Sequence, residues 1–192
     1  MILSDRFERA VMYAARHHKK QKRKGTHIPY ISHLLSVAGI ALEYGAGEDE
    51  AIAALLHDAV EDPGGRLVEE VREEIRKLFG DRVMEIVEGC TDTDVSPKPP
   101  WRERKEAYIA HIRNASPSVR LVSSADKLQN AQCILKDYRN IGEALWGRFT
   151  GGREGTLWYY RALVSSFREG HETPVVEELD RVVTELERLA SR

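Results

Sequence analysis

Apolar residues recur at helical spacing along most of this chain, and the pattern leaves little room for a fold that contains a sheet. Near the end of the sequence, for example, Val175, Leu179, Val182, Leu186 and Leu189 follow one another at intervals of three or four residues. This apolar face suits either the core or a homo-oligomer contact. No run of alternating apolar and polar residues is long enough to indicate a strand. We therefore expect an all-α protein, a bundle of about eight to ten helices.

Glycine and proline residues mark the expected ends of these helices. The first helix begins after the cap residue Ser4 and ends in the polar run KKQKRKGTH. The segment VSPKPP, residues 95–100, has three prolines in six positions and is expected to be a surface loop. A further loop is expected at Pro63-Gly64-Gly65. The other predicted helices cover residues 31–44, 49–59, 67–80, 81–92, 101–114, 119–138, 152–168 and 174–190.

Size and composition indicate one ordinary globular domain. The 192 residues suffice for a full-sized core, and 42% of them are apolar while 31% are charged. The net charge of −2 gives no global reason to expect a nucleic-acid or membrane partner, and no run of eighteen apolar residues occurs. The N-terminal residues do not form a signal-peptide pattern, and Cys90 and Cys133 suggest neither a disulfide framework nor a zinc knuckle. We therefore expect a cytoplasmic protein.

The stretch AALLHDAVED, residues 53–62, places polar groups at the end of an apolar helix. Burying an unpaired carboxylate is costly, so His57 and Asp58 need a partner. His33 and Asp126 each interrupt another apolar run, and a divalent cation bound by all four side chains would keep the carboxylates ionised. Two imidazoles and two carboxylates suit Mn²⁺, Fe²⁺ or Zn²⁺ better than a structural thiolate zinc site does. Taken singly, each residue is more readily explained as a hydrogen-bonded polar group of the core.

Taken together, these residues form the pattern H…HD…D, and the chain resembles the HD-domain metal-dependent phosphohydrolases. Four segments are similar, in order, to signatures of the hydrolase domain of Rel/SpoT-type alarmone enzymes: QKRKGTHIPYISHLLSVAGIAL, AALLHDAVED, LFGDRVMEIVEGCTD and RLVSSADKLQNAQCI. The match covers roughly residues 14–135. It implies a single HD domain over residues 1–192, in which the helices of residues 136–192 pack on the motif-bearing core. The metal ligands that it implies are His33, His57, Asp58 and Asp126.

The resemblance also implies a catalytic role for the acid pair Glu61 and Asp62. If the helix continues, Glu61 shares a face with His57, and Asp62 shares a face with Asp58. A carboxylate at that place is able to orient the attacking water or to move its proton. The alternative is a helix end that simply turns to solvent. Pro63 stands where the family usually has threonine, so the shape of the following loop is open.

Nucleotide contacts are implied for a second group of residues. Arg23 and Lys24 match the Arg-Lys of the family signature R-K-x-G-x-P-Y, in which the arginine packs on the base and the lysine meets phosphate. In ADKLQN, where the family usually has ADKLHN, Asn130 would bond the sugar or phosphate and Lys127 would pair with acids near the metal. Trp158, Tyr159 and Tyr160 form an aromatic cluster, in which Trp158 or Tyr159 is a candidate wall of the nucleotide pocket, although buried packing explains at least two of the three.

The expected activity is hydrolysis of the 3′-pyrophosphate of a purine nucleotide alarmone, (p)ppGpp to GDP or GTP, with one divalent ion. Mn²⁺ is expected, with Fe²⁺, Zn²⁺ and Mg²⁺ as alternatives. Adenine alarmones and a nicotinamide dinucleotide phosphate stay open as substrates, because stacking on Arg23 tolerates any purine. An HD-type nucleotidase would have the same four ligands, but the R-K-x-G-x-P-Y stretch and the Glu-Asp pair argue against it. The intact ligand set argues against a non-catalytic nucleotide-sensing module.

Overall fold

The secondary structure is almost entirely helical. The computed structural model describes residues 2–93, 95, 97–170 and 172–191, and in these ranges it contains nine α-helices, one 3₁₀ helix and no strand beyond an isolated bridge. The helices are α1 (Asp5–His17), α2 (Ile31–Glu43), α3 (Glu48–Leu56), α4 (Val68–Phe79), α5 (Asp81–Cys90), α6 (Trp101–Arg113), α7 (Pro117–Ile141), η1 (Gly142–Arg148), α8 (Gly152–Gly170) and α9 (Pro174–Ala190). The expected all-α class is confirmed. None of the helices in the described ranges has the length and apolar character needed to cross a bilayer.

Most helix ends lie within a few residues of their predicted positions because local chemistry sets them. Ser4 caps α1 by accepting a hydrogen bond from the backbone N–H of Arg6, and Ser116 caps α7 in the same way. Gly80 separates α4 from α5 at a φ of 92°, which favours glycine. The predicted end of α3 at residue 59 is wrong, because the helix ends at Leu56. The 3₁₀ helix η1 was not predicted. The predicted loop of residues 95–100 has no helix in its described part, and residue 96 lies outside that part.

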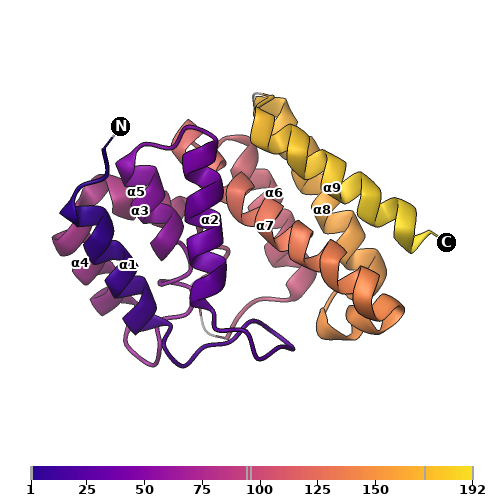
Figure 1. Ribbon diagram of the computed structural model, residues 1–192, viewed down its shortest axis with the longest axis horizontal. Helices are drawn as coiled ribbons and strands as arrows, with labels where there is room; N and C mark the ends of the chain where they lie inside the picture. The colour runs from indigo at the N-terminus through magenta and orange to yellow at the C-terminus, as the bar shows by residue number, and fades with distance from the viewer. Residues whose placement is uncertain (1, 94, 96, 171, 192) are drawn as a thin grey trace.

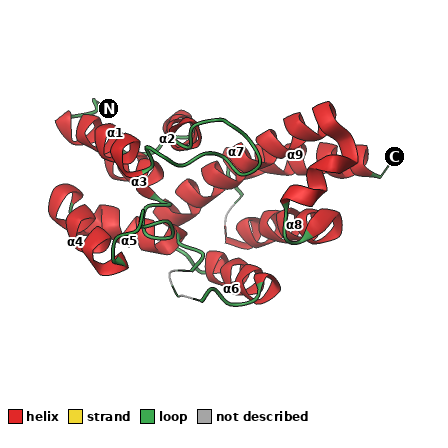
Figure 2. Cartoon of the chain, turned by 90° about the horizontal axis from the view of Figure 1, so that it is seen from below, coloured by secondary structure: helices red, strands yellow, loops and turns green. Residues whose placement is uncertain are grey.

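The long helix α7 connects the two ends of the molecule. Figure 1 shows α1, α3, α4 and α5 at one end and α8 and α9 at the other, with α7 running between them, and Figure 2 shows the same arrangement from below. Along its length α7 packs against α2, α3, α5, α8 and α9. It therefore buries polar residues as well as apolar ones, including Ser123, Ser124 and Asp126.

A short hairpin between α1 and α2 carries the basic run. The backbone N–H of Arg23 donates to the carbonyl of Ile28 at 2.9 Å, and that of Tyr30 donates to Gln21 at 3.0 Å. Gly25 forms its turn with a φ of 71°, and a Cβ at that position would lie 2.8 Å from Cδ of Arg148. The positive φ favours glycine at this position, so Gly25 shapes the hairpin that carries Arg23 and Lys24.

Candidate active site

Two imidazoles and two carboxylates meet in the interior. His33 comes from α2, His57 and Asp58 follow the end of α3, and Asp126 lies in the middle of α7. His33 Nε2 lies 3.2 Å from Asp126 Oδ1 and 3.6 Å from Asp58 Oδ2. His57 Nε2 lies 3.1 Å from Asp58 Oδ2 and 3.6 Å from Asp126 Oδ1. The four residues proposed as ligands from the sequence are thus brought to one point, and three of them, His33, His57 and Asp58, have ligand atoms within 4.8 Å of one another.

The second nitrogen of each imidazole is fixed in a way that suits a metal ligand. His57 Nδ1 donates to the carbonyl of Ala54 at 2.8 Å, and His33 Nδ1 pairs with Gln129 Oε1 at 2.6 Å. Because oxygens of this kind only accept, Nδ1 carries a hydrogen in both rings, which leaves Nε2 as the atom that faces the carboxylates and that would bind an ion from the neutral ring. His57 Nε2 is buried and has no hydrogen-bond partner among the described residues. A divalent cation fits this donor set, since it would bind the orphaned nitrogen and both acids.

The pKa values of the acids and imidazoles in this cluster depend on one another's charges. Burial raises the pKa of the Asp58 carboxyl, but His57 and His33 outweigh it and hold that pKa well below its usual range. Burial likewise raises the pKa of Asp126, which Lys127 and the two imidazoles lower well below the ordinary value. Burial lowers the pKa of His57, yet Asp58 and Asp126 reverse the effect and raise it well above the usual value. The buried carboxylates are therefore ionised only because cationic groups face them.

Three neighbouring side chains hold the carboxylates in place. The Tyr30 hydroxyl donates to Asp58 Oδ2 at 2.5 Å, and Asn130 Nδ2 donates to Asp126 Oδ1 at 2.6 Å. Lys127 Nζ lies 2.6 Å from the other oxygen of Asp126. Asn130 in turn accepts a hydrogen bond from Arg23 Nη2 at 2.6 Å. Lys127 and Asn130 thus contact an acid of the cluster directly, and Arg23 reaches it through one residue.

The two acids that follow, Glu61 and Asp62, lie in different surroundings. The helix α3 ends at Leu56 and does not continue through residues 57–62. Glu61 and Asp62 therefore do not share helix faces with His57 and Asp58. Glu61 faces the large pocket beside the cluster, where Oε1 lies 3.0 Å from Nζ of Lys98. Burial raises the pKa of Glu61 and the charge of Asp58 raises it further, while Lys98 opposes both. The Asp62 carboxylate does not line that pocket and instead accepts a hydrogen bond from Gln21 Nε2 at 2.9 Å.

The pocket beside the cluster has a volume of about 660 Å³, which lies within the range of small-molecule sites. Arg23, Lys24, Lys127 and Asn130, for which nucleotide contacts are expected from the sequence, all line it. Trp158 does not line it, and its ring lies instead under the guanidinium of Arg102, 3.3 Å from the ring centroid. The aromatic residues that do line the pocket are Trp101, Tyr159, Tyr160, Tyr30 and Phe149.

Sequence reasoning missed a second charged group in the same pocket. Asp92, just after α5, forms ion pairs with Arg104 and with Lys105, whose Nζ lies 2.8 Å from Asp92 Oδ2. Burial lowers the pKa of Lys105, and the charge of Lys127 lowers it further. Asp92 closes the quoted segment LFGDRVMEIVEGCTD, which was the available signal, whereas Arg104 and Lys105 lie in a polar helix with no distinguishing pattern. Together with Lys127 they make this end of the pocket cationic.

Comparisons with known proteins agree with this geometry. A family model described as HD domain matches residues 10–157. The guanosine-3′,5′-bis(diphosphate) 3′-pyrophosphohydrolase MESH1 of Xenopus tropicalis is 43% identical over 140 residues, which are 71% of this chain and 72% of the frog protein. MESH1 of Homo sapiens is 41% identical over 127 residues, 63% of this chain and 65% of the human protein. A solved structure, described as a metazoan ortholog of SpoT that hydrolyzes ppGpp, is similar with a TM-score of 0.78 and 27% identity over 97% of this chain and 98% of that one.

Proposed function

The chain belongs to the HD domain family, and we propose that it removes pyrophosphate from the 3′ position of a purine nucleotide alarmone, converting (p)ppGpp to GDP or GTP. The observation that carries the proposal is the buried His33, His57, Asp58 and Asp126 cluster beside a cationic, aromatic-walled pocket. The two MESH1 proteins are named for this reaction, and the similar solved structure is described as hydrolyzing ppGpp.

His33, His57, Asp58 and Asp126 would hold one divalent ion. A nitrogen and carboxylate donor set of this kind favours Mn²⁺, with Fe²⁺, Zn²⁺ and Mg²⁺ as alternatives, over the thiolate ligands of structural zinc. Such an ion supplies a Lewis acid for a phosphoryl oxygen and lowers the pKa of water. The chain's own contribution is to fix both Nε2 atoms and both carboxylates before any ion arrives.

The reaction requires a base near the attacking water. Water adds to the phosphorus attached to the 3′ oxygen, the bond between that phosphorus and the 3′ oxygen breaks, and one proton of the water ends on the 3′ oxygen. Glu61 is the acid of the pair that faces the pocket, and its raised pKa brings it closer to the range in which it accepts and returns a proton near neutral pH. Asp62, tied to Gln21, holds the turn that presents Glu61.

The substrate's charge and its ring would meet different walls of the pocket. Lys127, Lys105 and Arg104 lie together at one end, where they suit the pyrophosphate group. Arg23, held by Asn130, offers a guanidinium plane on which a purine stacks, and Lys24 lies beside it to meet a 5′ phosphate. Of the two aromatic residues considered from the sequence, Tyr159 rather than Trp158 lines the pocket and would pack against the nucleotide.

The direct test is to load the purified protein with Mn²⁺ and to offer ppGpp, pppGpp, their adenine counterparts, a nicotinamide dinucleotide phosphate and simple nucleotides. We expect pyrophosphate release from the guanine alarmones and none from simple nucleoside triphosphates. Release from the adenine alarmones alone would move the assignment to that substrate. Tight nucleotide binding with no turnover of any compound would refute the enzymatic proposal in favour of a sensing module.

A further inference from the structure

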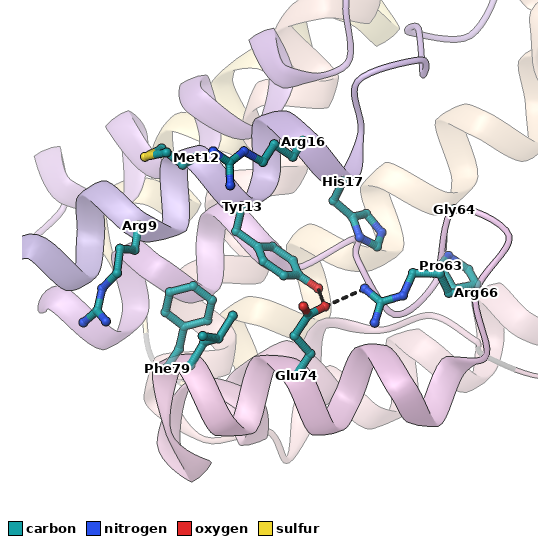
Figure 3. Close-up of a pocket in the computed structure, with 11 residues that line it drawn as sticks. Arg9, Met12, Tyr13, Arg16, His17, Pro63, Gly64, Arg66, Glu74 and Phe79 are labelled. Atoms are coloured by element: carbon teal, nitrogen blue, oxygen red, sulfur yellow. Dashed lines mark hydrogen bonds and ion pairs between the residues drawn. The ribbon is translucent and has the colours of Figure 1, made fainter.

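A second pocket lies on the other side of the turn that carries Glu61 and Asp62. Its volume is about 560 Å³, and its walls come from α1, the end of α4 and the turn at Pro63 and Gly64. Figure 3 shows the Tyr13 ring of α1 reaching toward Glu74 of α4. In the described part of the chain this pocket shares no lining residue with the pocket beside the metal ligands. It therefore belongs to no step of the proposed reaction.

The charged side chains of this second pocket are mostly arginines. Arg66 is neutralised by Glu74, whose Oε2 lies 2.5 Å from Arg66 Nη1 and accepts a hydrogen bond from the Tyr13 hydroxyl at 3.0 Å (Figure 3). Arg9 and Arg16 also line the pocket, and no carboxylate of the described residues pairs with either of them. Arg9 donates only to a backbone carbonyl one turn earlier. Two guanidinium groups are thus available to an anion, and their planar donors suit a phosphate.

The remaining walls are flat and apolar. The Tyr13 ring stacks on His17 with centroids 5.7 Å apart, and it meets Phe79 edge-on at 5.9 Å. Met12 and Leu78 are 45% and 40% exposed, and both line this cavity. Arginines next to aromatic and apolar walls are the combination that binds a flat ring bearing a phosphate.

We propose that this pocket is a second binding site, for a nucleoside phosphate, in which Arg9 and Arg16 take the phosphate and Tyr13 packs against the base. The proposal goes beyond the proposed hydrolysis and does not depend on it. The site has a physical link to the acid pair, because His17 Nε2 donates to the backbone carbonyl of Asp62 at 2.9 Å. A ligand in the pocket would therefore rest on the same turn that presents Glu61.

Methionine methyl groups give a site-specific readout of this binding. The chain has three methionines, of which Met12 lines the second pocket and Met84 is buried in the core. We would label the methionine methyls with ¹³C, assign Met12 by Met12→Leu, and titrate GDP, ADP, guanosine and inorganic phosphate. We expect GDP or ADP to shift the Met12 signal in a saturable way, and guanosine and phosphate to bind at least about tenfold more weakly. No Met12 shift with either nucleotide, or phosphate alone binding as tightly, would overturn the proposal.

Variants separate the second pocket from the substrate pocket. The double change Arg9→Gln and Arg16→Gln should weaken nucleotide binding at Met12 about tenfold or more, while Arg181→Gln, an exposed arginine of α9, should leave it unchanged. The Met12 response should persist in Asp126→Asn, and also in Arg23→Gln, which alters only the substrate pocket. A response that disappears in both of these variants would be transmitted from the substrate pocket, and would refute a separate site.

Discussion

The imidazole of His33 owes its orientation to a residue outside the ligand set. Its Nδ1 pairs with Gln129 Oε1 at 2.6 Å. The amide nitrogen of Gln129 donates to Cys133 Sγ at 3.1 Å, so the amide oxygen is the atom that faces His33. The family usually has histidine at position 129, and its replacement by glutamine leaves the proposed ligands in place but sets the hydrogen bond made by His33 Nδ1. The structure assigns Gln129 the role of holding the ring so that Nε2 faces the carboxylates.

Replacing Gln129 should therefore weaken metal binding without removing a ligand. We expect Gln129→Ala to lower the affinity for Mn²⁺ by about 10- to 100-fold, because partners of this kind typically contribute that much. Gln129→His should recover part of the loss, since a ring nitrogen is also able to accept from Nδ1 of His33. Isothermal titration calorimetry measures the affinity, and Gln132→Ala, an exposed neighbour on α7, is the control. Equal affinities for wild type and Gln129→Ala would contradict the assigned role.

Glu61 should affect rate rather than metal binding. Its carboxylate lines the substrate pocket and pairs with Lys98, and within the described residues it forms no hydrogen bond or ion pair with a proposed ligand. We expect Glu61→Gln to reduce kcat by about 10²- to 10⁴-fold, the usual contribution of a general base, with Mn²⁺ affinity retained. Glu85→Gln on α5, where the side chain is exposed, is the matched control, and Asp126→Ala should lose metal and activity together. Turnover of Glu61→Gln at the wild-type rate would remove Glu61 from the mechanism.

At the scale of elements, local signals predicted helix positions but not how a helix ends when tertiary contacts take over. The pattern of residues 49–59 reads as one helix, yet α3 stops at Leu56. Asp58 is then held by Tyr30 from the preceding hairpin, a contact between residues 28 positions apart. Tertiary packing also decides which aromatic residue of α8 lines the pocket, so the sequence left Trp158 and Tyr159 both as candidates. Helical spacing shows that Trp158 and Tyr159 lie on different faces of α8, but not which face meets α6 and α7.

Replacing Gly80 or Gly39 with alanine should change the free energy of unfolding in opposite directions. Gly80 joins α4 to α5 at a φ of 92°, and a Cβ there would meet nothing within 4 Å, so Gly80→Ala suffers from backbone strain alone. We expect a loss of about 1–3 kcal/mol in the free energy of unfolding. Gly39 lies inside α2 with nothing within 4 Å of a Cβ and no positive φ, so Gly39→Ala should gain roughly 0.5–1 kcal/mol. Urea denaturation measures both, and a change of the same sign in the two variants would contradict the backbone argument.

At the scale of the whole molecule, α7 joins the proposed metal ligands to the C-terminal helices. It carries Asp126 on the face toward α2 and α3, and it packs along α9 and α8 further on. The sequence predicted a single domain over residues 1–192 from size and from resemblance. We propose that residues 1–192 unfold as one domain, because α7 packs against helices at both ends of the molecule.

Metal binding provides a test of this proposal, because two of the three tryptophans follow all four proposed ligands in the sequence. The proposed ligands lie at residues 33–126, and Trp146 and Trp158 lie beyond them, whereas Trp101 lies within that range. Mn²⁺ at about a hundred times its Kd should stabilise the protein by about 2.7 kcal/mol and raise Tm by about 5–10 °C. If residues 1–192 unfold as one domain, tryptophan fluorescence and far-UV circular dichroism should show the same Tm and the same rise, and a chelator should reverse both. A tryptophan transition that stays in place while the circular dichroism transition moves would show that the C-terminal helices unfold separately from the metal site.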